Sequence, residues 1–452
     1  MASVDLPWDI TTEILSRLPV KSLMRFKCVS TSFFNLISND PIFRKQHRHH
    51  HSRFKKVILV PRRCTESRLE LAGLPYPVLY LSPEGDVRVG LNKVLGLPYL
   101  NISLNDCCGC DVFCKHRGFQ RPYQDMYFHN ICEGLFCMSI PGGGPAVIWN
   151  PTTRQTSRRI KSCLLPNLPY IYPRWIGYSL AHDSRSDVYK LLGLTISGHN
   201  TYKLYFYSTE MGMWMYIEES SPCDYVMYYG KTTIVNGAFH WLGSNEEKFR
   251  RPHVVVSLDI SDETYGTLAL PEAICDNSKG PKLCELKGKL CIFSQHIQDL
   301  HWDLWVMNEY GDVDSMMRMF RMPIVKLIDR YAQPFHMLED DTLIVRQSTE
   351  FYSYKDGRKI LHNTIFCRYG GLYVDPYVYF ESLISPHIFL HAINHKIMGN
   401  DEHSSNTMPE NEFSSKLVAT NFSATTNRGK HVVAKKRWLK SSLQRLCFCK
   451  SF

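Results

Sequence analysis

The first fifty residues carry apolar positions at a spacing that predicts short amphipathic helices. Apolar residues from Ile10 to Leu18 recur on one helical face, and Pro19 ends this first helix. A second helix follows, and Ser30 can cap a third that stops near Pro41. About forty residues of helix cannot bury this much apolar surface among themselves. The surface is therefore covered either by the rest of the chain or by a partner.

From residue 54 to about 390 the pattern changes to short strands rich in β-branched and aromatic residues, separated by turns with Gly, Asn, Asp and Pro. Five similar two-strand units begin at Gly134, Val188, Gly237, Gly288 and Asp341. Successive starts are 54, 49, 51 and 53 residues apart, and a period near 50 is typical of kelch-type propeller blades. An earlier pair of strands near 57–60 and 78–88 makes about six units, and the last pair is expected to close near 379–385.

The helical segment resembles the F-box in the form found in plant proteins. The resemblance rests on Leu6-Pro7, on the run from Ile14 to Leu23, on 25–30 and on 36–38. It implies a three-helix motif that docks on the Skp-type adaptor of a Skp–cullin–F-box ubiquitin ligase. The residues that it assigns to adaptor binding are Leu6, Pro7, Ile14, Leu15, Leu18, Pro19, Leu23 and Val29. Phe33 stands where the family commonly has Trp, so we expect weaker packing of this anchor but retained docking.

The repeats resemble the F-box-associated domain of plant F-box proteins, a group that includes S-locus F-box proteins and regulators of immune receptors. The resemblance is carried by stretches such as 148–154, 235–241 and 304–310. The two resemblances together cover most of residues 6–390. They imply a small all-α F-box head followed by an all-β, propeller-like (kelch-type) domain. The expected limits are 1–50 for the head, 54–395 for the propeller-like domain and 396–452 for a tail.

Composition and charge narrow the function classes. The 452 residues are 44% hydrophobic and 12% aromatic, as expected for a well-packed body. A net charge of +10 is modest for this length, so no nucleic-acid partner is predicted. The first twenty residues contain charged side chains and do not resemble a signal peptide, and no apolar run predicts a membrane span. We therefore expect a cytoplasmic or nuclear protein, or both, with reduced thiols.

Two segments contain clustered side chains of the types that bind metals. Cys107, Cys108, Cys110 and Cys114 have the close spacing that zinc ligands require, but a second half-site at matched spacing is absent. We interpret this segment as a Cys-bearing insertion between blades, near 104–133. The histidine run 47–51 is interpreted as a solvated helix end. No metal ligand and no cofactor are assigned.

Catalytic motifs are not found: there is no nucleophile elbow, Walker loop or His-Glu-x-x-His. Gly142–Pro145 is interpreted as a hairpin turn. In the tail, 400–427 is polar and predicted to be disordered. The basic segment 430–452 leaves three interpretations open, namely a membrane-surface helix, a nuclear-import signal and an unstructured basic tail.

The leading hypothesis is a non-catalytic substrate-recognition subunit of a Skp–cullin–F-box ubiquitin ligase. Its partners would be a Skp-type adaptor, cullin through that adaptor, and an unknown target protein held by propeller loops. Candidate loops are the 104–133 insertion and those around 165–175 and 220–230. Two alternatives come from other classes: a non-ligase propeller interaction scaffold, and a propeller enzyme, which would need a metal cluster.

Overall fold

The computed structural model describes most of the head and the strand regions of the body. The described residues are 6–52, 55–61, 76–81, 87–95, 127–139, 144–162, 175–196, 202–209, 211–217, 226–227, 232–244, 254–275, 279–296, 300–323, 332–347, 350–363, 368–369 and 372–389. All of them belong to one compact unit, which ends at Lys396. The four insertion cysteines, the predicted turn at 142–145 apart from Gly144 and Pro145, and the tail lie outside these residues.

The head contains four helices within residues 6–52, one more than the sequence pattern predicts. They are α1 (Trp8–Ser16), α2 (Val20–Phe26), α3 (Thr31–Asn39) and α4 (Pro41–His51). The Ser30 hydroxyl accepts a hydrogen bond from the Phe33 amide at 3.1 Å, as expected for the N-cap of α3. The Asp40 carboxylate accepts from the amides of Ile42 and Phe43, and Pro41 occupies the first turn of α4. The residues that end α3 therefore begin α4, and the prediction of a stop at Pro41 was incomplete.

The body consists of antiparallel sheets, six of them among the described residues. Sheet 1 contains β25 (Arg368–Tyr369), β26 (Leu372–Phe380), β1 (Lys55–Pro61), β2 (Tyr76–Leu81) and β3 (Val87–Leu95). Sheet 2 contains β4 (Tyr127–Cys132), β5 (Leu135–Ser139), β6 (Ala146–Asn150) and β7 (Gln155–Thr156). Sheet 3 contains β8 (Trp175–Asp183), β9 (Val188–Ile196), β10 (Tyr202–Ser208) and β11 (Met213–Tyr216).

The remaining three sheets follow in chain order. Sheet 4 contains β12 (Val226–Met227), β13 (Thr233–Val235), β14 (Ala238–Ser244), β15 (Val254–Asp259) and β16 (Tyr265–Ala269). Sheet 5 contains β17 (Lys279–Leu286), β18 (Lys289–His296), β19 (His301–Met307) and β20 (Met316–Pro323). Sheet 6 contains β21 (Gln333–Met337), β22 (Leu343–Gln347), β23 (Glu350–Lys355) and β24 (Arg358–Asn363). The short helices α6 (Glu272–Cys275) and η4 (Pro386–Phe389) complete the elements.

These sheets succeed one another as the blades of a propeller, which confirms the predicted fold class. Neighbouring inner strands are in contact: β26 with β4, β4 with β8, β13 with β17, β17 with β21, and β21 with β26. Sheets 3 and 4 share an apolar cluster that includes Leu192, Leu204, Trp241 and Val256. Further clusters fill the interfaces between sheets 1 and 2, 2 and 3, 4 and 5, and 5 and 6. The core is therefore a series of blade interfaces.

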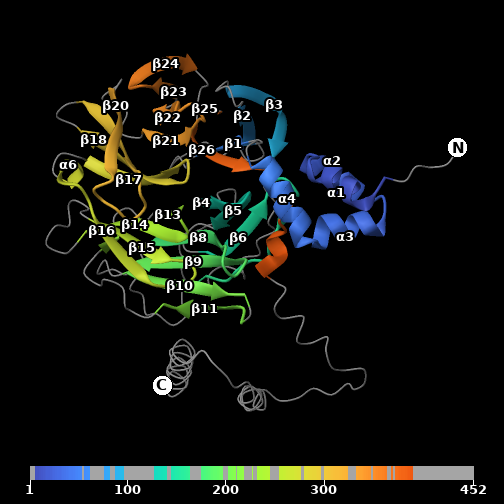
Figure 1. Ribbon diagram of the computed structural model, residues 1–452. Helices are drawn as coiled ribbons and strands as arrows, with labels where there is room; N and C mark the ends of the chain where they lie inside the picture. The colour runs from blue at the N-terminus through green and yellow to red at the C-terminus, as the bar shows by residue number, and fades with distance from the viewer. Residues whose placement is uncertain are drawn as a thin grey trace, which may run out of the picture. The chain divides into compact units, whose positions relative to one another are not determined.

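Sheet 1 closes the ring with strands from both ends of the body. β26 pairs antiparallel with β1 from Lys55 opposite Phe380 to Pro61 opposite Val374. In Figure 1, the orange β26 lies beside the blue β1. Closure near residue 380 agrees with the sequence pattern.

The period of about 50 residues comes from hairpin turns between the first and second strands of successive blades. Glu133 and Gly134 have φ of 49° and 81°, and Lys287 and Gly288 have φ of 51° and 77°. Two positive φ angles in a two-residue loop define a type I′ turn, which matches the twist of the flanking strands. The repeat units inferred from the sequence therefore start at the second strand of a blade and not at the first. The predicted insertion also extended too far, because its last residues form β4, an inner strand of sheet 2.

A buried asparagine joins sheet 2 to the segment that follows β26. The Asn150 amide nitrogen donates to the carbonyls of Ser382 at 2.9 Å and Ile384 at 2.8 Å. Its oxygen accepts from the amides of Thr152 and Thr153. The buried side-chain amide thus has hydrogen-bond partners for both its nitrogen and its oxygen. These bonds hold the segment that follows β26 against sheet 2.

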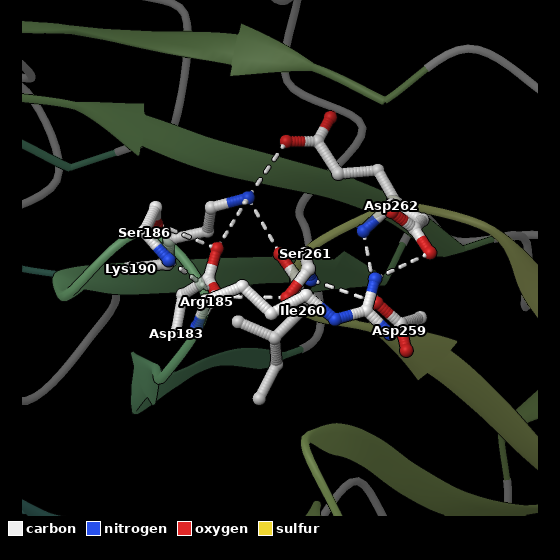
Figure 2. A network of polar contacts seen from close by, with 9 residues as sticks. Asp183, Arg185, Ser186, Lys190, Asp259, Ile260, Ser261 and Asp262 are labelled. Atoms are coloured by element: carbon white, nitrogen blue, oxygen red, sulfur yellow. Dashed lines mark hydrogen bonds and ion pairs between the residues drawn. The ribbon is translucent and has the colours of Figure 1, made fainter.

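Sheets 3 and 4 are tied together by a polar network between their turns (Figure 2). The buried Asp183 carboxylate accepts hydrogen bonds from the hydroxyls of Ser261 at 2.6 Å and Ser186 at 2.8 Å. Burial alone would raise the pKa of Asp183, but these bonds and those from the amides of Arg185 and Ser186 lower it to about 2. Lys190 reaches the Ile260 carbonyl from the same side.

Replacing Gly134 with Ala is expected to destabilise the fold more than replacing Gly288 with Ala. Both residues have positive φ, so each substitution carries about 1–2 kcal/mol of backbone strain. A methyl group at Gly134 would also lie 2.6 Å from the Phe380 carbonyl oxygen and the Ser382 Cβ, whereas at Gly288 nothing lies within 4 Å. Urea unfolding measures the difference, and equal losses would contradict the close approach.

Asp183→Asn is expected to lower the free energy of unfolding at pH 7 by about 2.5 kcal/mol, because the folded pKa of about 2 lies nearly two units below the ordinary value of 3.8. Because the folded pKa is depressed, the wild-type advantage is complete above the unfolded pKa near 4 and disappears as pH falls toward 2. The variant and the wild type should therefore converge in acid. Asp262→Asn, which alters the exposed partner of Arg185, is the control and should change little. A pH-independent difference for Asp183→Asn would refute the linkage.

Candidate functional site

The residues predicted to bind an adaptor do not all lie on the surface of the head. Leu6, Ile14 and Val29 are 61%, 48% and 66% exposed. Pro7 and Pro19 are also exposed, at the N-caps of α1 and α2. These five residues form the exposed part of the predicted set.

The other three predicted residues lie inward. Leu15 and Leu23 are buried, and Leu18 is half-buried. The apolar cluster of the head comprises Leu15, Leu23, Leu36, Ile37 and Phe43, with Leu18, Phe26, Phe33 and Leu383 packed against it. Leu15 and Leu23 thus hold the helices together behind the exposed residues. Whether all eight serve adaptor binding stays a prediction.

Sequence reasoning missed four exposed apolar residues of the head: Trp8, Ile10, Phe34 and Ile42. Ile10 was placed on the same helical face as the buried Leu15, but it is 49% exposed. Trp8 stacks on Phe33 with ring centroids 5.9 Å apart. The head therefore does present an indole near Phe33, although it comes from α1 and not from the third helix. The signal available in the sequence was the Trp directly after Leu6-Pro7.

The histidine run is a solvated helix end only in part. His49 is exposed, but His47 is buried and its Nε2 donates to the Leu18 carbonyl at 3.0 Å. The His51 ring stacks on His47 with centroids 4.2 Å apart. Burial, and then the neighbouring His51, lower the pKa of His47 to about 4. Gln46 on the same helix donates to Glu13 of α1. α4 therefore covers the C-terminal end of α1 with neutral imidazole and amide groups.

The head is attached to the body through α4 and through the segment after β26. Arg48 of α4 forms an ion pair with Glu133, the first residue of the β4–β5 turn. Glu133 also accepts from the Tyr189 hydroxyl and lies 3.4 Å from His182 Nδ1, both in sheet 3. Burial, and then the Glu133 charge, raise the pKa of Tyr189. Glu133 of sheet 2 thus contacts both the head and sheet 3, while Leu383 packs against the apolar core of the head.

Antiparallel strands give the propeller two different faces. We call one the turn face, because it carries the tight turns such as 133–134, 236–237 and 287–288. The head and Leu383 belong to this side, since Arg48 meets Glu133 there. The opposite side, the connection face, holds the strand ends from which the chain passes between blades, such as Leu95 to Tyr127. The predicted target loops attach to strand ends on this connection face, and they lie largely outside the described residues.

Within the part of the chain that the structure describes, no helix is both long and apolar enough to span a membrane.

Lowering the pH from 7 to 5 is expected to destabilise the head by about 2 kcal/mol through His47. The folded pKa lies below the unfolded value of 6.5, so this stability is complete above pH 6.5 and decreases toward pH 4. His47→Gln should weaken the pH dependence of hydrogen-exchange protection in α1 and α4. His49→Gln, at an exposed position of the same helix, should leave it unchanged, and an identical effect of the two substitutions would contradict the assignment.

Comparison with known proteins agrees with the division of the chain into a helical head and a propeller body. The F-box domain model matches residues 4–45, and the model for the F-box associated beta propeller domain matches residues 111–367. The chain is 25% identical over 396 residues to the F-box/kelch-repeat protein At3g23880 of Arabidopsis thaliana, covering 84% of this chain and 96% of that protein. It is 23% identical to F-box protein CPR1 of Arabidopsis thaliana, covering 72% and 75%.

Among solved structures, a nidogen/laminin complex aligns with a TM-score of 0.40 at 7% identity, covering 73% of this chain and 99% of that one. This likeness carries no argument about function. The matches to the two domain models cover the helical head and most of the blades. The chain therefore belongs to the plant F-box proteins that carry an F-box-associated beta propeller domain.

Proposed function

We propose that this protein is a substrate-recognition subunit of a Skp–cullin–F-box ubiquitin ligase and acts in the cytoplasm, the nucleus or both. The observation that carries the proposal is the set of large apolar side chains exposed on the head, where residues 6–52 are all described. This set, the docking surface, comprises Leu6, Trp8, Ile10, Ile14, Val29, Phe34 and Ile42. F-box domains generally bind Skp-type adaptors, and such a surface suits that role.

The apolar core behind the docking surface is already complete. Leu23 and Ile37 are almost fully buried, and Leu383 of the body packs against the same cluster. The body thus covers one side of the head but leaves the docking surface open. Large exposed apolar patches on folded proteins commonly mark protein interfaces, and we propose that these seven side chains contribute to one. Burying such side chains against a partner contributes about 1.5–3 kcal/mol each when burial is complete.

The attachment of the head suggests how the protein would position a target. The head contacts the turn face through Arg48 and Glu133, so the connection face is left for a target protein. Ring closure and the Asn150 contacts fix the segment after β26, and Leu383 of this segment packs against the head. In a ubiquitin ligase such a connection would hold the target's lysines at a defined distance from the charged enzyme. This contribution is positioning, so the chain would need no catalytic residue of its own.

The alternative function is a propeller interaction scaffold that binds no adaptor. The contacts of the head with Leu383 and Glu133 are compatible with it, because they show that the head packs partly on its own body. The two functions differ in what covers the docking surface. An adaptor covers it in the ligase, whereas it stays in contact with solvent in the scaffold.

Ile14→Asp and Val29→Asp are each expected to weaken binding of the full-length chain to a Skp-type adaptor by about tenfold or more, because a charge would be buried in the interface. Both side chains are about half exposed or more, so the melting temperature should change little. Met317→Asp, at a 63% exposed position of β20, is the matched control and should bind normally. Calorimetry or co-purification measures the effect. Failure of the wild-type chain to bind any Skp-type adaptor would refute the ligase proposal.

A further inference from the structure

Sheet 5 gathers two histidines and a carboxylate at one end. His296 is the last residue of β18 and His301 the first of β19, and the two lie directly opposite each other in the strand register. Asp303 lies two residues after His301 and therefore on the same face of the sheet. All three are buried. Their ligand atoms lie within 4.8 Å of one another, and no other such group occurs in the described ranges.

The distances in this cluster suit metal coordination better than direct hydrogen bonding. His296 Nε2 lies 3.5 Å and His301 Nε2 lies 3.4 Å from Asp303 Oδ2. An N–H···O hydrogen bond is about 2.7–3.2 Å long. Ligands about 2.0–2.2 Å from a tetrahedral zinc ion are separated by about 3.3–3.6 Å. The two observed separations therefore match an edge of a zinc coordination tetrahedron.

The side chains are also held in place from outside the cluster. Arg321 of β20 contacts both oxygens of Asp303, through Nε at 3.0 Å and Nη2 at 3.1 Å. The histidine rings are nearly parallel, with centroids 4.6 Å apart. Such contacts orient metal ligands in known sites. Ser294, opposite Asp303 in the register, adds a buried hydroxyl on the same face for which the described residues supply no hydrogen-bond partner.

We propose that His296, His301 and Asp303 form a binding site for a divalent transition-metal ion, with Zn²⁺ as the best fit. Neutral imidazole nitrogens and a carboxylate are ligands that Zn²⁺ accepts, and a fourth position is left for water. The ion joins β18 to β19 at the connection face, opposite the turn at Lys287 and Gly288. It would act as a structural clamp on the side of the propeller proposed to hold a target.

Nearby positive charge sets the expected strength of this site. Arg318 Nη1 lies 3.6 Å from Asp303 Oδ2, and the Arg321 guanidinium is closer still. Both charges oppose a cation. Arg321 also orients the carboxylate, so its removal has two effects of opposite sign. Arg318 makes only the longer contact, so Arg318→Gln should tighten metal binding several-fold.

The test uses the full-length chain with Cys107, Cys108, Cys110 and Cys114 all replaced by Ser, so that the other zinc candidate is removed. The chain is stripped with a chelator and titrated with Zn²⁺ or Co²⁺ alone. Elemental analysis should find about one tightly bound zinc ion per chain. Co²⁺ should give the visible bands of a nitrogen- and oxygen-ligated site, without the intense ultraviolet bands of thiolate ligation.

His301→Ala and Asp303→Asn should each weaken zinc binding about a hundredfold and abolish the rise in melting temperature on adding zinc. His336→Ala, in the neighbouring sheet, is the matched histidine control and should bind as the parent does. Absence of bound zinc in the parent chain overturns the proposal, a result that needs no variant to fold. Equal binding by His301→Ala and the parent, or no change with Arg318→Gln, also counts against it.

Discussion

Pairing between β1 and β26 is the interaction on which the rest of this structure depends. It joins strands from the two ends of the body in one sheet and so closes the ring of blades. The segment that precedes β1 in the chain belongs to no blade, because residues 6–52 form the helical head. Closure therefore brings the head and the segment after Phe380 to the same place. Leu383 can then enter the core of the head, and Asn150 can bind the carbonyls of Ser382 and Ile384.

Polar contacts on the turn face connect one blade to the next. Glu133 contacts Tyr189 between sheets 2 and 3, Ser261 contacts Asp183 between sheets 3 and 4, and Lys287 pairs with Asp341 between sheets 5 and 6. The Arg48–Glu133 ion pair adds the head to this series. The turn face is thus occupied by contacts between blades and with the head. The proposed target binding and the proposed metal site are both assigned to the connection face.

The propeller fold could be predicted from the sequence because its tight turns are encoded by residues adjacent in the chain. Asn-Gly and Lys-Gly turns mark where a blade begins its second strand, so their spacing revealed the propeller period. The inner strands were harder to recognise. β4, for example, follows a segment without strand pattern and was assigned to the insertion. The sequence pattern did not predict α4, because a proline commonly ends the helix before it. Here Asp40 caps a new helix, and Pro41 occupies the first turn of that helix.

The sequence by itself determined the two-part architecture, the blade period and the family, since these rest on residue order and turn chemistry. Only the tertiary structure decided which apolar residues of the head are covered. Ile14 and Leu15 are adjacent in the chain, yet one is exposed and the other buried, because α2, α3, α4 and Leu383 cover only one side of α1. The burial of His47 and the meeting of His296, His301 and Asp303 also depend on helix packing and strand register, which no local pattern contains.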